Sequence, residues 1–179
     1  MARPAGGTTL GPMPANEIHP AVRIGHVHLN VADIDRSLAF YRDALGFRVV
    51  ADGRPRGLDI AFVAAGDYHH HIALNSIETA GATAPPPGHT GLYHVAFVYP
   101  DRRELVKALR RLLERGVPVD HATDHGGTVS LYLEDPDGNG VELYYDRPRS
   151  SWFDDDGRPV LRADHFDPRE LLEEPALPQ

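Results

Sequence analysis

Histidine and carboxylate side chains are the groups in this sequence that could bind a metal ion. The chain contains eleven histidines and no cysteine, so disulfides, thiolate metal sites and cysteine nucleophiles are all excluded. In the stretch GHVHLNV, Gly25 to Val31, the side chains alternate as they do in a strand. His26 and His28 therefore share one polar face, and that face either is hydrated or lines a metal site.

A single carboxylate stands among apolar residues later in the sequence. Glu142 lies between Val141 and Leu143 in a predicted strand, GVELYYD. An ionised side chain in a buried strand is costly unless it is paired with another charge or bound to a metal. Glu142 is therefore a candidate metal ligand, and a structural salt bridge is the alternative.

Composition limits the class of protein. The chain has 179 residues, of which 41% are hydrophobic and 25% charged, and its net charge is −8. These values are typical of a soluble globular domain, and the acidic balance argues against a nucleic-acid partner. The start of the chain, interrupted by proline and glycine, does not resemble a secretory signal, and no apolar run reaches membrane length. We expect a cytoplasmic protein with no membrane partner.

A duplicated pattern of elements must position these side chains. After the first strand, the sequence predicts a helix over 33–45 and three strands within 47–52, 58–66 and 69–75. After a proline-rich joint the order repeats, with a strand at 92–100, a helix at 101–116 and strands at 117–123, 128–135 and 140–146.

The predicted fold class is therefore α+β, with two tandem β-α-β-β-β units. We expect a flexible lead at 1–21, the paired domain at 22–148 and an acidic extension at 149–179, with at most a short helix near 168–174.

The duplicated unit, with GHVHLNVADIDRSLAFYRDALGF at one end and YLEDPDGNGVELYYDRP at the other, resembles the vicinal oxygen chelate superfamily. That superfamily includes glyoxalase I, bleomycin-resistance proteins, fosfomycin-resistance enzymes and type I extradiol dioxygenases. The resemblance implies a curved mixed sheet around a metal-binding cup, with ligands on the first and last strands of the units.

Carried over residue by residue, the resemblance implies that His26, His94 and Glu142 are the metal ligands. Ala73 stands where glyoxalase I has a fourth ligand. Two histidines and one carboxylate form the facial triad of non-haem Fe(II) enzymes, and Mn(II) accepts the same ligands. This set favours an extradiol dioxygenase that cleaves a catechol-type vicinal diol, with the diol and dioxygen as partners and no organic cofactor.

The resemblance also implies residues that assist the reaction. His70, three residues before Ala73, would transfer protons, with His71 as the reserve candidate if a bulge shifts His70 away. His125 and Tyr132, the latter ten residues before Glu142, would orient intermediates by hydrogen bonds. His121 and His165 are expected on solvated loops.

Two other functions remain open at this point. Another metal-dependent enzyme of the superfamily, such as an isomerase, epimerase or lyase, could use the same ligands without oxygen. A drug-binding resistance protein would need no metal. The resemblance also allows a homodimer.

Overall fold

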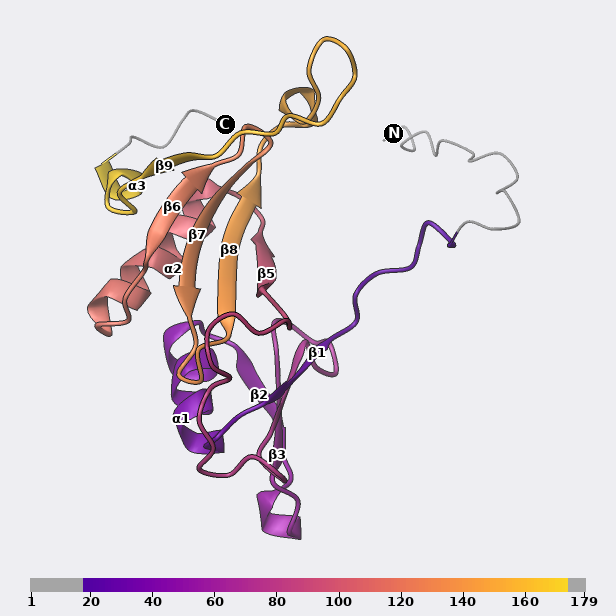
Figure 1. Cartoon of the computed structure of the whole chain (residues 1–179), viewed down its shortest axis with the longest axis vertical. Coiled ribbons are helices and arrows are strands. Elements are labelled where there is room, and N and C mark those ends of the chain that lie inside the picture. Colours follow the sequence, from indigo (N-terminus) through magenta and orange to yellow (C-terminus); the bar gives the residue numbers. More distant parts are fainter. Residues whose placement is uncertain (1–17, 174–179) are drawn as a thin grey trace, which may run out of the picture.

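The computed structural model describes residues 18–173, which form two β-α-β-β-β halves stacked along the long axis (Figure 1). This arrangement confirms the predicted fold class. The predicted flexible lead falls mostly on residues 1–17, and the end of the acidic extension on 174–179, both outside the described residues.

The first half contains a four-stranded sheet with the order β1-β4-β3-β2, in which β1 and β4 run parallel. Its strands are β1 (Val27–Asn30), β2 (Arg48–Asp52), β3 (Ile60–Ala64) and β4 (Ile72–Asn75). The predicted alternation is confirmed, since Leu29 and Val31 are buried whereas His26 and His28 are exposed. The polar face of β1 is thus turned away from the core.

The helix of the first half begins with α1 (Ile34–Leu38) and continues as a π-helix (Ala39–Ala44). Asp33 caps its start, because its carboxylate accepts a hydrogen bond from the Arg36 backbone N–H at 3.0 Å. The chain leaves the helix at Gly46, whose φ of 88° favours glycine. The apolar residues that recur at helical spacing are all buried, namely Ile34, Leu38, Tyr41 and Leu45.

The second half contains a five-stranded sheet with the order β5-β8-β7-β6-β9, and α2 (Arg102–Glu114) covers one face of it. Its strands are β5 (His94–Tyr99), β6 (His121–Asp124), β7 (Thr128–Glu134), β8 (Gly140–Asp146) and β9 (Asp164–Phe166). The leucines of α2 that face the sheet are fully buried, namely Leu105, Leu109 and Leu112. Leu113, which the helical spacing also placed on this stripe, is 37% exposed and lies at its edge.

Strand β9 was not predicted from the sequence. It pairs antiparallel with β6 and is followed by α3 (Glu170–Glu173), the short helix expected near 168–174. A strand of three residues is too short to show an alternating pattern, which explains why the sequence predicts the helix alone. Part of the acidic extension therefore completes the second sheet.

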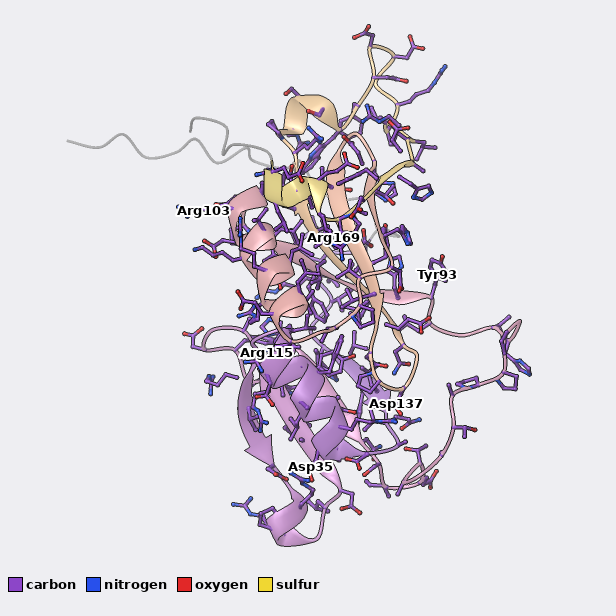
Figure 2. All side chains as sticks on the ribbon, turned by 90° about the vertical axis from the view of Figure 1, so that its left-hand side faces the viewer. Asp35, Tyr93, Arg103, Arg115, Asp137 and Arg169 are labelled. Carbon is purple, nitrogen blue, oxygen red and sulfur yellow. The ribbon has the colours of Figure 1, made fainter. Side chains whose placement is uncertain are left out.

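The two halves join where the β7–β8 turn meets the first helix. The Tyr41 hydroxyl donates to the Asp135 carboxylate at 2.9 Å, across 94 residues of sequence. The Arg111 guanidinium donates to the carbonyl groups of Ala44 and Leu45 at 2.9 and 2.7 Å. In Figure 2, the labelled Asp137 lies on the same turn, beside the helix of the first half. These contacts decide how the two sheets lie relative to each other.

Among residues 18–173, no helix is long and apolar enough to cross a membrane.

Replacing Asp101 with alanine should lower the free energy of unfolding by about 1 kcal/mol, because Asp101 is the N-cap of α2. Its carboxylate accepts from the Glu104 backbone N–H at 2.9 Å, and alanine leaves that donor without a protein partner. Urea unfolding followed by circular dichroism measures the change. Asp101→Asn retains the acceptor and should stay within a few tenths of a kcal/mol of the parent. Equal unfolding midpoints for the parent and Asp101→Ala would show that the cap contributes nothing.

Candidate functional site

One face of the second sheet carries a polar residue on every strand. Parallel pairing of β5 with β8 and antiparallel pairing of β8, β7, β6 and β9 bring these residues into a row. The residues, in strand order across the sheet, are His94, Glu142, Tyr132, His121 and His165. The opposite face of the same strands is apolar and packs into the core beneath α2. Strand alternation therefore gathers the polar groups on one side.

Glu142 lies at the centre of a chain of close polar contacts. Its Oε2 lies 2.9 Å from His94 Nε2, and its Oε1 accepts a hydrogen bond from the Tyr132 hydroxyl at 2.9 Å. The Tyr132 hydroxyl in turn lies 2.9 Å from His125 Nε2. Both carboxylate oxygens thus have a partner. The structure brings together four side chains that were predicted to belong to the site, and each contacts the next.

A glycine allows His94 to approach β8. Gly140 pairs with His94, and a Cβ at this position would overlap the Tyr93 carbonyl oxygen and press on the His94 side chain. The His94 ring meets Glu142 through Nε2. Its other nitrogen, Nδ1, is buried and has no hydrogen-bond partner among the described residues. Close strand pairing at Gly140 therefore aims the imidazole at the carboxylate.

Tyr132 remains a hydroxyl donor at neutral pH. Burial, together with the hydrogen bond to Glu142 and the charge of that carboxylate, raises the pKa of Tyr132 from 10.0 to about 12. A protonated phenol next to the carboxylate holds it in one orientation.

The first sheet carries a second group of histidines. The His26 and His70 rings lie 4.5 Å apart between centroids, and His70 also stacks on Phe62 at 4.5 Å with an interplanar angle of 15°. His71 instead lies against Tyr68, at 4.8 Å between ring centroids. His71 directly precedes β4, and its backbone continues the ladder, because its N–H donates to the Val63 carbonyl and its carbonyl accepts from the Val27 N–H, both at 2.9 Å.

His70 has the properties of a proton acceptor. Partial burial, and then repulsion from His26 and the other nearby histidines, lowers its pKa below the ordinary histidine value. A neutral imidazole at physiological pH can take up a proton from a bound ligand. His70 is the candidate whose ring contacts His26, whereas His71 lines the cavity between the halves together with His26 and His94. Which of the two transfers protons stays a prediction.

The three predicted metal ligands are brought together only in part. Two ligands about 2.1 Å from one ion and about 90° apart are separated by about 3 Å, which the His94 to Glu142 distance of 2.9 Å matches. His26 lies with His70 on the other sheet, and within residues 18–173 no three His, Asp or Glu side chains converge closely enough to hold a metal. The donor pair fits a divalent ion, and the third ligand stays a prediction.

A cavity of about 820 Å³ at the junction of the halves is lined by both His26 and His94. Its wall is largely apolar, with Phe47, Phe97 and Tyr99 among the lining residues. This volume lies in the range of small-molecule sites. The cavity therefore reaches His26 and His71 of the first half and His94 of the second, whereas Glu142, Tyr132 and His70 do not line it.

Two further histidines lie on the polar face of the second sheet, although the sequence analysis placed them on solvated loops. His121 begins β6 and stacks on Tyr132 at 4.7 Å between ring centroids, with an interplanar angle of 16°. His165 lies on β9, 5.2 Å from the His121 ring. The register of β6 with β7, in which His121 pairs with Tyr132, could have been inferred from a hairpin at 124–128, but β9 had no sequence signal.

Comparison with known proteins identifies one family with more than one reaction. Residues 23–143 match the family described as the Glyoxalase/Bleomycin resistance protein/Dioxygenase superfamily. The chain is 39% identical over 158 residues to a catechol-2,3-dioxygenase of Bacillus subtilis. The aligned part covers 88% of this chain and 53% of that protein. It is 30% identical over 120 residues to a probable lactoylglutathione lyase of Synechocystis sp., covering 66% of this chain and 91% of that protein.

A solved structure of a glyoxalase/dioxygenase from Nostoc punctiforme superimposes with a TM-score of 0.59 and 22% identity, covering 74% of this chain and 97% of that one. This likeness shows a shared fold. The chain spans about half the length of the catechol-2,3-dioxygenase that it matches.

Proposed function

Because this chain belongs to the glyoxalase/bleomycin resistance protein/dioxygenase superfamily, we propose that it is an Fe(II)-dependent extradiol dioxygenase acting on a catechol-type vicinal diol. The observation that carries the proposal is the contact row from His94 through Glu142 and Tyr132 to His125. The 39% identity to a catechol-2,3-dioxygenase supports the same reaction class.

His94 and Glu142 would hold the iron, with His26 as the proposed third ligand. When bound, a divalent iron supplies a centre that a vicinal diol can chelate and electrons that dioxygen can accept. Two neutral imidazoles and one carboxylate leave that centre with one net positive charge. Mn(II) would be held by the same donors.

The chain's own residues would orient the Glu142 carboxylate and transfer protons. Tyr132 holds one oxygen of Glu142, which leaves the other oxygen directed at His94. His125 can exchange a proton with the Tyr132 hydroxyl across 2.9 Å, and His70 can accept the proton that a bound catechol hydroxyl releases.

A lyase is the second candidate, and one observation favours it. The chain covers 91% of the length of the probable lactoylglutathione lyase but only 53% of the catechol-2,3-dioxygenase. Against it, the buried Ala73 on β4 offers no ligand in the first sheet where a lyase of this superfamily would need a fourth. A homodimer and a cytoplasmic location are further parts of the proposal.

The test is metal analysis followed by turnover. Protein purified anaerobically with Fe(II) should retain about one iron per chain and, on addition of catechol, should consume oxygen and form a yellow ring-opened product. The matched sample without oxygen should stay colourless. Bound metal with no oxygen uptake on several catechols, together with formation of lactoylglutathione from added glutathione and methylglyoxal, would replace the dioxygenase by the lyase. Absence of bound metal would indicate a metal-free binding protein.

A further inference from the structure

The segment that follows β8 crosses one end of the second sheet and then pairs with β6 at the sheet edge as β9 (Figure 1, orange to yellow). It is anchored at its start, where Trp152 Nε1 donates to the Arg147 carbonyl at 2.8 Å and the Val160 N–H donates to the Trp152 carbonyl at 3.0 Å. It is anchored at its end by the pairing of β9 with β6. The residues between these anchors therefore have a defined place.

His125 is held by three contacts. Its backbone N–H donates to the Thr128 carbonyl at 2.9 Å, which closes the turn between β6 and β7. Its ring Nδ1 lies 2.8 Å from the Arg162 carbonyl oxygen, and its Nε2 lies 2.9 Å from the Tyr132 hydroxyl. A carbonyl oxygen can only accept, so Nδ1 carries a proton. In the neutral ring, Nε2 is then an acceptor, and the single proton of the Tyr132 hydroxyl can be donated either to Nε2 or to Glu142 Oε1.

The side chain of Arg162 is held by two carboxylates. Its guanidinium pairs with Asp124 at 2.8 Å and with Asp164 at 2.7 Å. Asp124 immediately precedes His125, is also held by Arg147 at 2.6 Å, and accepts from the Gly126 N–H at 2.7 Å. Asp124 and Asp164 are themselves partners in the β6–β9 register. The Arg162 carbonyl is therefore tied to the backbone that carries His125.

We propose that Arg162 is a positioning residue that acts through His125: its ion pairs hold its carbonyl oxygen at Nδ1 and so fix the tautomer that presents Nε2 to Tyr132. The contribution to turnover rests on the proposed function, whereas the effect on the tautomer does not. Without the carbonyl, the neutral ring would exchange between its Nδ1–H and Nε2–H forms and would lose its orientation toward Tyr132.

The tautomer is measured by ¹⁵N NMR of the histidine rings in the full chain without added metal, and the His125 signals are identified by their loss in His125→Gln. The parent should show the Nδ1–H form. Arg162→Ala should shift the signals toward a mixture, and Asp164→Asn, which removes one of the two ion pairs, should shift them in the same direction. Arg158→Ala is the matched control, since Arg158 is a largely exposed arginine of the same segment that pairs with Asp156. Unchanged His125 signals in both Arg162→Ala and Asp164→Asn overturn the proposal.

Turnover supplies a second readout. Arg162→Ala should lower kcat about tenfold with little change in KM, as expected for the loss of an orienting partner, and Arg162→Lys should recover part of it. In the His125→Gln background the same substitution should have no further effect, because its action passes through the missing ring. If Arg162→Ala lowers kcat by the same factor in the parent and in the His125→Gln background, the proposal is contradicted. If the parent converts no catechol, the proposed function fails and the NMR result alone decides the role of Arg162.

Discussion

Replacing Glu142 with glutamine lowers kcat/KM for catechol by at least about 100-fold and abolishes iron retention, because the change removes the only carboxylate of the proposed ligand set. The glutamine is nearly isosteric, and its amide oxygen can still accept from Tyr132. The strand register around it should therefore persist. What is lost is the negative charge that faces His94 at 2.9 Å and that a divalent ion would require.

Iron content by elemental analysis and steady-state oxygen uptake measure this effect. Asp146→Asn is the matched control, since Asp146 is an exposed carboxylate on the same strand and the same face, four residues further along β8. It should leave both quantities unchanged. A Glu142→Gln protein that kept its iron and its activity would remove the central assignment of the site.

Replacing Asp135 with alanine lowers the free energy of unfolding by about 3 to 5 kcal/mol, the range for breaking a buried polar network by removing one member. Asp135 is 5% exposed and accepts hydrogen bonds from the Tyr41 hydroxyl, the Asp137 and Asn139 backbone N–H groups and the Asn139 side chain. Alanine leaves the fully buried Tyr41 hydroxyl without its acceptor. Since this contact joins the two halves, both sheets should lose stability together.

Urea unfolding followed by fluorescence and circular dichroism measures the loss, and coincident transitions would show that the halves still unfold as one unit. Glu134→Ala is the control, because Glu134 is the exposed residue next to Asp135. It should change stability by no more than about 0.5 kcal/mol. A loss for Asp135→Ala as small as that of the control would mean that the β7–β8 turn does not hold the halves together.

The environment of Tyr41 agrees with this expectation. Burial, and then the charge of Asp135 and the hydrogen bond to it, raises the pKa of the Tyr41 phenol above its ordinary value. The phenol therefore stays protonated and donates to Asp135 wherever the protein is folded near neutral pH. Loss of Asp135 leaves the buried Tyr41 hydroxyl without its protein acceptor, and the desolvation of that group makes the expected cost large.

Local pattern in the sequence was enough to predict much of the fold. The alternation of GHVHLNV and GVELYYD predicts which faces of β1 and β8 are polar, and helical spacing predicts the buried residues Leu38 and Tyr41. These patterns are local because the side-chain direction repeats every two residues in a strand and every 3.6 in a helix. The resemblance also selected Tyr132, ten residues before Glu142, and in the structure its hydroxyl donates to that carboxylate.

The tertiary structure alone decided the remaining parts of the site. The His70 ring lies against His26, whereas His71, whose backbone extends the β4 ladder, lines the cavity between the halves. Parity gives the face of a residue and not the ring contacts that its side chain makes. His26 lies apart from the His94 and Glu142 pair, because the relative placement of the two sheets depends on contacts between residues as distant as Tyr41 and Asp135.

The sequence by itself therefore determined the two units, the polar faces of their strands and the residue types available for a metal. It could not determine what the acidic extension does, because the group that meets His125 is a backbone carbonyl, which every residue has and no pattern distinguishes. Only the folding of β9 against β6 brings the Arg162 carbonyl, and His165 with it, to the edge of the site. Contacts of that kind arise from chain packing and not from residue type.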